Sequence, residues 1–190
     1  THQPVESLTI LRSIPNCFVF RPADGNEVIG SYIKAIQTNN SPSCICLSRQ
    51  SLPQLKNSSI EGVFKGGYII EESNLLNTNL DLILIATGSE VSLCIDLLNK
   101  INNKLNIRVV SMPCLEVFNL QSNEYKNSIL PKNILKISVE AGITNFWYKY
   151  ADHCIGIDSF GASGKGSDVM NHYYLSTERI ILQIKKYISF

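Results

Sequence analysis

The sequence lacks long apolar runs and lacks an excess of charge of either sign. None of its apolar stretches approaches the ~18 residues that a membrane-spanning helix needs. Its 17 Lys and Arg against 16 Asp and Glu leave a net charge of +1, which excludes the strongly basic surface typical of nucleic-acid-binding proteins. We therefore expect no nucleic-acid partner and no membrane partner. With 44% hydrophobic residues in 190, the chain can bury the core of one large domain or of one and a half smaller ones.

Paired cysteine motifs are also missing. No CxxC pair occurs, so neither a zinc site nor a redox dithiol is indicated, and we expect no bound metal. Several cysteines lie in strand-like apolar runs, where a thiol behaves as a small hydrophobic group. We expect all six to be reduced, as in a cytoplasmic protein. They are Cys17, Cys44, Cys46, Cys94, Cys114 and Cys154.

The familiar phosphate-binding and catalytic motifs are absent as well. Residues 161–166 fail the phosphate-loop pattern, because Ser159 stands where the first glycine belongs and Gly166 follows Lys165 in place of Ser or Thr. We interpret this segment as a connection before the last helices. No Ser-His-Asp or Cys-His set can be assembled from the sequence.

The first part of the chain has the pattern of a strand–helix–strand unit. The predicted elements are a helix after Pro4, a strand at 17–20, a helix at 25–37 and a strand at 43–47. Asp24 and Glu27 have the spacing of a capping box, which begins the second helix. One side of that helix is apolar and carries Val28, Ile29, Tyr32, Ile33 and Ile36. A strand, a helix and a second strand in this order favour a parallel sheet.

The polar stretch 48–61, which contains Pro53, indicates a junction, and a second α/β region follows it. Its predicted strands are at 68–70, 82–86, 107–111, 134–139 and 155–157, with helices at 90–104 and 177–187. Near-continuous apolar strands between helices imply a sheet covered on both faces. The turn at 87–90 follows a strand and opens a helix. Such a turn can hold a phosphate on its free amides, although a tight turn with a serine cap is favoured.

Three charged residues follow predicted strands. Arg49 lies just past strand 43–47, and Arg21 just past strand 17–20. Ligands of open α/β sheets bind at this carboxyl edge, and a guanidinium binds phosphate with two parallel hydrogen bonds. Position does not separate Arg49 from Arg21. Glu140 ends strand 134–139, where a capping or interface carboxylate is favoured over a functional one.

Eight segments resemble those of transketolases, in the same order. They are T-H-Q-P-V-E at 1–6, R-P-A-D-G-N-E at 21–27, L-S-R-Q at 47–50, K-G-G-Y at 65–68, A-T-G-S-E-V at 86–91, R-V-V-S-M-P at 108–113, S-V-E-A-G at 138–142 and F-G-A-S-G at 160–164. The resemblance implies that residues 1–59 are the C-terminal half of a pyrimidine-binding domain. It implies that residues 60–190 are a complete C-terminal α/β domain, whose mixed five-stranded sheet is mostly parallel and covered by helices.

The resemblance also implies a reaction. A transketolase uses thiamine diphosphate, with Mg²⁺ or Ca²⁺, to move a two-carbon ketol unit from a ketose phosphate to an aldose phosphate in the pentose phosphate pathway, and it is a homodimer. The domain that binds the diphosphate and the metal, and the glutamate that activates the cofactor, are expected outside this chain. The start at Thr1, without an initiator Met, fits a segment of a longer protein. We expect no catalytic or cofactor-binding residue here, no bound cofactor, and no activity of the chain alone.

Two substrate-binding residues are implied by the same resemblance. His2 matches the histidine of T-H-Q-P, and Arg49 matches the arginine of S-R-Q. Both contact the phosphate of the sugar substrate in that family, and a guanidinium with an imidazole donor suits a phosphate dianion. Two alternatives stay open. One is a related thiamine enzyme such as dihydroxyacetone synthase or deoxyxylulose phosphate synthase, and the other is a separate non-catalytic module for dimerisation or ligand binding.

Overall fold

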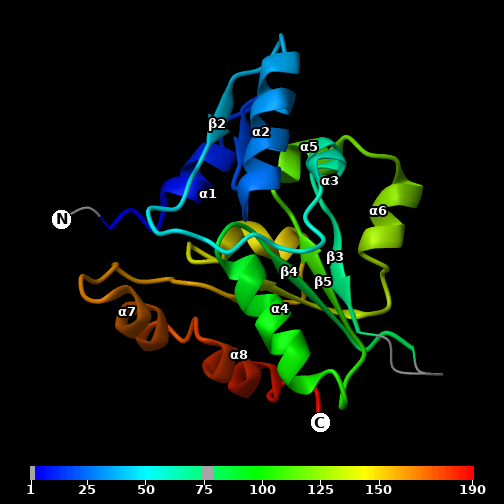
Figure 1. Cartoon of the computed structure of the whole chain (residues 1–190), viewed down its shortest axis with the longest axis vertical. Coiled ribbons are helices and arrows are strands. Elements are labelled where there is room, and N and C mark those ends of the chain that lie inside the picture. The colour runs from blue at the N-terminus through cyan, green and yellow to red at the C-terminus, as the bar shows by residue number, and fades with distance from the viewer. Residues whose placement is uncertain (1–2, 74–78) are drawn as a thin grey trace.

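A computed structural model of the chain describes residues 3–73 and 79–190. Figure 1 shows a smaller N-terminal unit, in blue and cyan, above a larger unit built around one sheet. Within the described residues, no helix combines the length and the apolar character that crossing a bilayer requires.

The N-terminal unit is a parallel strand pair with one long helix between its strands. Its elements are α1 (Ser7–Arg12), β1 (Phe18–Phe20), α2 (Gly25–Gln37) and β2 (Ser43–Ile45). The two strands pair in parallel, with Val19 opposite Cys44, which confirms the strand–helix–strand prediction. The Asp24 carboxylate accepts a hydrogen bond from the Glu27 main-chain N–H at 3.1 Å, so the predicted cap begins α2. Strand β2 is two residues shorter than the predicted run.

The apolar side of α2 faces solvent rather than the core. Ile29, Tyr32, Ile33 and Ile36 are all exposed, and Ile36 reaches 77%. The opposite side packs on α3 (Ile60–Lys65) through Gly30, where a Cβ would lie 2.9 Å from Val63 Cβ. A two-stranded sheet with one helix cannot cover both sides of that helix, so a contiguous apolar surface is left open.

The larger unit is built on a mixed sheet. Its strands are β3 (Tyr68–Glu72), β4 (Leu82–Ala86), β5 (Ile107–Ser111), β6 (Leu135–Val139) and β7 (His153–Ile155). Their order is β3-β5-β4-β6-β7. Only β3 runs antiparallel to its neighbour, with a bulge between Ile69 and Glu71, and the other pairs are parallel. The predicted five-stranded, mostly parallel sheet is therefore confirmed, with β7 two residues earlier than expected.

Helices cover both faces of this sheet. They are α4 (Glu90–Ile101), α5 (Leu115–Asn119), α6 (Asn123–Ile129), the 3-10 helix η1 (Asn145–Lys149), α7 (Gly166–His172) and α8 (Thr177–Ile184). The central strand β4 serves both layers because its side chains alternate. Leu82 and Leu84 join the core under α4 and α8, whereas Ile83 and Ile85 join the core under α5, α6 and η1. Helices α4 and α8 lie side by side (Figure 1).

Five short helical elements were not predicted: α3, α5, α6, η1 and α7. Each has five to seven residues, which is too short to show the apolar repeat of an amphipathic helix. The cysteines agree with the expectation of free thiols. Cys17 and Cys44 approach each other, but their sulfur atoms are 3.8 Å apart, much longer than the roughly 2.05 Å of a disulfide bond.

Gly66 offers a test of how α3 connects to β3. It ends α3 with φ of +80°, and a Cβ there would lie 2.2 Å from the Phe118 main-chain nitrogen. We expect Gly66→Ala to lower the free energy of unfolding by at least about 2 kcal/mol, because both the left-handed backbone and the contact with α5 penalise a side chain. Urea unfolding measures this. Gly166→Ala is the matched control, since nothing lies within 4 Å of its Cβ position. An equal change in both variants would contradict the argument.

Candidate functional site

The structure distinguishes Arg49 from Arg21, which their positions in the sequence did not. Arg49 lies four residues beyond β2 and is exposed. Among the described residues it has no hydrogen-bond or ion-pair partner. Arg21, in contrast, is largely buried, and its guanidinium is fully engaged by other parts of the chain. His2 lies outside the described residues.

Arg21 fills the turn that follows β4. Its Nη1 donates to the carbonyl oxygen and to Oγ1 of Thr87, both at 2.8 Å, and it forms an ion pair with Glu90. A Cβ on Gly88 would lie 2.9 Å from the Arg21 Cζ atom. Ser89 makes no side-chain cap on α4, but donates to the Glu90 carboxylate at 2.6 Å. The turn therefore holds an internal cation, which leaves no room for the phosphate considered from the sequence.

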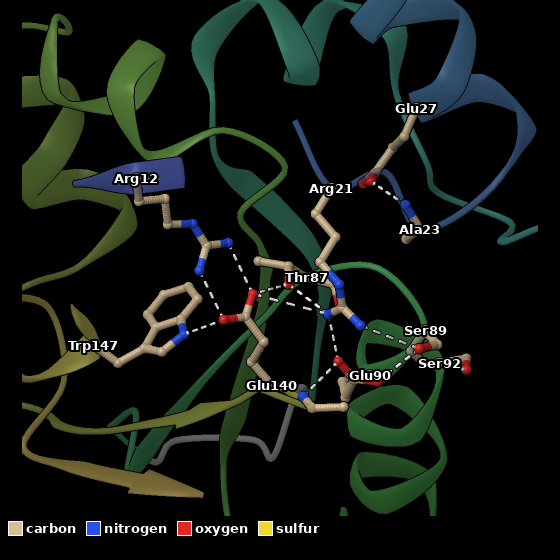
Figure 2. A network of polar contacts seen from close by, with 11 residues as sticks. Arg12, Arg21, Ala23, Glu27, Thr87, Ser89, Glu90, Ser92, Glu140 and Trp147 are labelled. Carbon is tan, nitrogen blue, oxygen red and sulfur yellow. Dashed lines mark hydrogen bonds and ion pairs between the residues drawn. The ribbon is translucent and has the colours of Figure 1, made fainter. Parts of the chain in front are cut away.

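Glu140 is the centre of a buried network (Figure 2). Its two carboxylate oxygens accept from the Nη1 and Nη2 atoms of Arg12 at 2.7 and 2.8 Å. They also accept from Thr87 Oγ1 at 2.5 Å and from Trp147 Nε1 at 2.8 Å. The network joins α1, the end of β4, the end of β6 and η1. Glu140 thus has the interface role that the sequence favoured.

Two opposing effects set the charge of Glu140. Burial alone would raise the pKa of this carboxyl, because its side chain is only 1% exposed. The positive charge and hydrogen bonds of Arg12, the charge of Arg21 and the Thr87 hydroxyl outweigh burial and lower the pKa to about 2. The carboxylate is therefore ionised at neutral pH and neutralised by its cationic neighbours.

A second buried carboxylate links α2 to the large sheet. Glu27 accepts from Tyr68 Oη at 2.7 Å, from Ser111 Oγ at 2.5 Å and from the Ala23 main-chain N–H at 2.7 Å. Burial raises the pKa of Glu27, and these hydrogen bonds partly oppose the rise. Both junction carboxylates are fully occupied by protein partners, which leaves neither of them available to a ligand.

The neighbours of the two predicted phosphate-binding residues meet at one cavity. Gln3 and Gln50 both line a cavity of about 670 Å³, whose other wall is the segment 162–170. The Gln3 side-chain amide lies 2.5 Å from Ser163 Oγ. Gln3 directly follows His2 and Gln50 directly follows Arg49, so the two segments singled out from the sequence approach each other across this cavity.

Sequence reasoning missed Arg12. It lies in the last turn of a six-residue helix and pairs with a residue 128 positions away. The only signal was a single arginine in an otherwise uncharged helix, and that pattern also suits an exposed helix end. Its side chain is 1% exposed, and the Trp147 ring lies 5.3 Å from its guanidinium carbon.

Two family models match the chain in sequence order. Residues 1–54 match the model described as "Transketolase, pyrimidine binding domain", and residues 66–176 match the "Transketolase-like TK C-terminal domain". The chain is 46% identical over 191 residues to transketolase 1 of Saccharomyces cerevisiae, covering 100% of this chain and 28% of that protein. It therefore spans a little over a quarter of the length of this curated relative.

Solved structures give the same likeness. A transketolase from Leishmania mexicana superposes with a TM-score of 0.92 at 36% identity, covering 97% of this chain and 27% of that one. A transketolase from Pichia stipitis, in complex with sedoheptulose-7-phosphate, superposes with a TM-score of 0.90 at 41% identity, with the same coverage of 97% and 27%.

The Glu140 network predicts a specific dependence of stability on pH. Because its folded pKa of about 2 lies below the ordinary 4.5, its contribution is full above about pH 4.5 and is lost as pH falls towards 2. We expect Glu140→Gln to lower the free energy of unfolding at pH 7 by about 3 kcal/mol or more, since it also leaves Arg12 buried and unpaired. Urea unfolding from pH 7 to pH 3 measures the difference.

The exposed Glu124 in α6 provides the control for this measurement. Glu124→Gln is expected to change stability by less than about 0.5 kcal/mol. A constant gap between Glu140→Gln and the parent chain across the pH range would show that the carboxylate charge does not matter.

Proposed function

The chain belongs to the transketolase family, and on that premise we propose that it is the C-terminal part of an enzyme that transfers a two-carbon ketol unit between sugar phosphates. In this proposal the donor is a ketose phosphate and the acceptor is an aldose phosphate. The order of the two matching domain models along the chain supports the assignment. The guanidinium of Arg49, which has no partner among the described residues, identifies a residue that could bind the substrate.

Arg49 supports the proposal because no described residue forms a hydrogen bond or an ion pair with its side chain. It is exposed just beyond the carboxyl end of a parallel strand, which is the edge where open α/β sheets bind ligands. Arg21, which directly follows β1, is bound instead by Thr87 and Glu90. We assign Arg49 to the substrate phosphate, which it binds through two parallel charge-assisted hydrogen bonds.

His2 is assigned as the second phosphate-binding residue. The support is indirect, because His2 lies outside the described residues. Its neighbour Gln3 and the neighbour of Arg49, Gln50, line the same cavity of about 670 Å³. A cavity of this volume accommodates a sugar phosphate, and the Pichia stipitis relative forms a complex with sedoheptulose-7-phosphate.

The domain assignment is also a proposal. We assign residues 1–59 to the C-terminal half of the pyrimidine-binding domain and residues 60–190 to the C-terminal domain. The exposed apolar side of α2 supports the first part, because Ile29, Tyr32 and Ile36 are left uncovered. An exposed surface of this kind is typical of an interface, and the remainder of the pyrimidine-binding domain is its expected cover.

The described residues of this chain do not fit the cofactor and its metal. Over 3–73 and 79–190, no group of three or more His, Cys, Asp or Glu side chains is arranged to hold a metal ion. The glycine-rich stretch 161–166 fails the phosphate-loop pattern. We therefore place the thiamine diphosphate and Mg²⁺ or Ca²⁺ sites of the proposed enzyme on other parts of the protein, and derive no step through them from this chain. We further propose a cytoplasmic homodimer, as the family resemblance implies.

The phosphate role of Arg49 is tested in the full-length enzyme. We expect Arg49→Ala to lower kcat/KM for a phosphorylated donor roughly 30- to 1000-fold. This corresponds to a loss of about 2–4 kcal/mol of transition-state stabilisation, because a bidentate charged contact is lost. Arg49→Lys should recover only part, since an ammonium lacks the second parallel donor. For unphosphorylated hydroxypyruvate, kcat/KM should change little. The exposed Arg179 of α8 supplies the control variant Arg179→Ala. Equal losses for both donors, or a lower melting temperature, would disprove the role.

The isolated 190-residue chain should show no ketol transfer with thiamine diphosphate and Mg²⁺ in excess. The reason is that its described residues offer no metal-ligand cluster, and the family resemblance places the cofactor domain elsewhere. A coupled spectrophotometric assay against a no-protein blank measures this, with a full-length transketolase as positive control. Turnover above the blank would favour a chain that assembles an active site by itself.

A further inference from the structure

A second cavity, of about 420 Å³, lies on the face of the sheet that α5, α6 and η1 cover. Its walls come from the end of α5, from α6 and η1, from residues around the start of β6 and from the residues just before β7. It shares no lining residue with the cavity beside Gln3 and Gln50. Its volume is within the range of small-molecule sites, and the proposed ketol transfer does not use it.

Positive charge is concentrated in this cavity. Its charged lining residues are Lys126, Lys132, Lys136, Lys149 and Asp152, whereas the whole chain carries a net charge of only +1. The single carboxylate is already engaged, because Asp152 accepts from the Lys136 main-chain N–H at 2.8 Å. Within the described part of the chain, Lys126, Lys132 and Lys149 form no ion pair.

Two of the ammonium groups that form no ion pair lie around one hydrogen-bonded pair. Asn119 Nδ2 donates to Tyr150 Oη at 2.7 Å. Lys126 Nζ is 3.3 Å from the carbonyl oxygen of the same Asn119, and Lys149 Nζ is 5.5 Å from the centre of the Tyr150 ring. Because Tyr150 Oη accepts from Asn119, its own hydrogen remains free to be donated to a ligand.

A third ammonium group is fixed in the wall. The Lys136 side chain is only 11% exposed, and its Nζ donates to the carbonyl oxygens of Ile134 at 2.7 Å and Lys132 at 3.3 Å. The nearest carboxylate oxygen, on Asp152, is 4.0 Å away. Neutral carbonyls satisfy its hydrogen bonds, and the ion pair with Asp152 offsets one of the four lysine charges in the lining, so the cavity keeps a net charge of +3.

We propose that this cavity binds a small molecule carrying at least two phosphate groups. Like charges gathered in a concave site repel one another, and a compact polyanion removes that repulsion. Lysine binds phosphate as a mobile point charge, and the exposed ring of Tyr148 offers a face for the organic part of the ligand. Nucleic acid is the poorer fit, because a balanced chain does not continue the positive surface beyond the cavity.

Differential lysine acetylation with inorganic pyrophosphate as the probe tests the proposal on the full-length protein. Thiamine diphosphate and its metal are kept saturating, so that pyrophosphate cannot act through the cofactor site. At twice the dissociation constant, the acetylation rates of Lys126, Lys132 and Lys149 should fall about threefold, since a third of the sites remain free. Lys104 and Lys186, which are exposed on other parts of the surface, should react at unchanged rates. Mass spectrometry reads each lysine separately.

Two comparisons decide the outcome. In K126Q/K149Q, pyrophosphate should no longer protect Lys132 from acetylation. The control K104Q/K186Q removes the same charge, and Lys132 should remain protected in it. Sodium sulfate at matched ionic strength should protect less than pyrophosphate. Equal protection by both salts, protection of Lys104 and Lys186, or unchanged protection of Lys132 in K126Q/K149Q would each overturn the proposal. The readout is local to these lysines, so it does not depend on whether the ketol-transfer assignment holds.

Discussion

The buried carboxylate of Glu140 holds the two units of the chain in one arrangement. A lone carboxylate so far from solvent would be destabilised by several kcal/mol. Here Arg12 and Arg21 approach it from the N-terminal unit, while Thr87 and Trp147 approach it from the larger one. Because every partner is needed to offset the burial, any displacement of one unit against the other leaves a charge unpaired. The small strand pair therefore depends on the large sheet for its position.

The same constraint explains why the two arginines that follow strands of the parallel pair differ. Arg21 lies next to Glu90 and the Thr87 turn, and its charge is balanced inside the molecule. Arg49 has no such partner in the described structure and stays in solvent, where holding a free guanidinium costs little. One guanidinium is thus used inside the fold, and the other is left without a partner among the described residues. The difference between the two arginines depends on which distant residues lie opposite each strand end, and the local sequence does not show this.

Local patterns predicted the strands and the longer helices, and long-range contacts decided the rest. The Asp24 cap is a contact over three residues, so the start of α2 could be predicted from spacing alone. Strand β4 is fully buried, and its apolar run made it easy to recognise. The burial of Arg12 could not be predicted, because its partner is 128 residues away. The apolar side of α2 was recognised, but its exposure depends on which surfaces the other elements already occupy. For the site, the family resemblance supplied Arg49, and the structure alone distinguished it from Arg21.

Strand β3 has a consequence for how copies of this chain can associate. It is the antiparallel edge of the sheet, it carries a bulge between Ile69 and Glu71, and Asn57 donates to the Glu71 carboxylate at 3.0 Å. A bulged edge with acidic side chains is a poor template for further strands. Continuous pairing of two sheets across subunits is thereby disfavoured at this edge. On this side of the sheet, association is left to side-chain surfaces, whose contacts can be specific to one partner and one orientation.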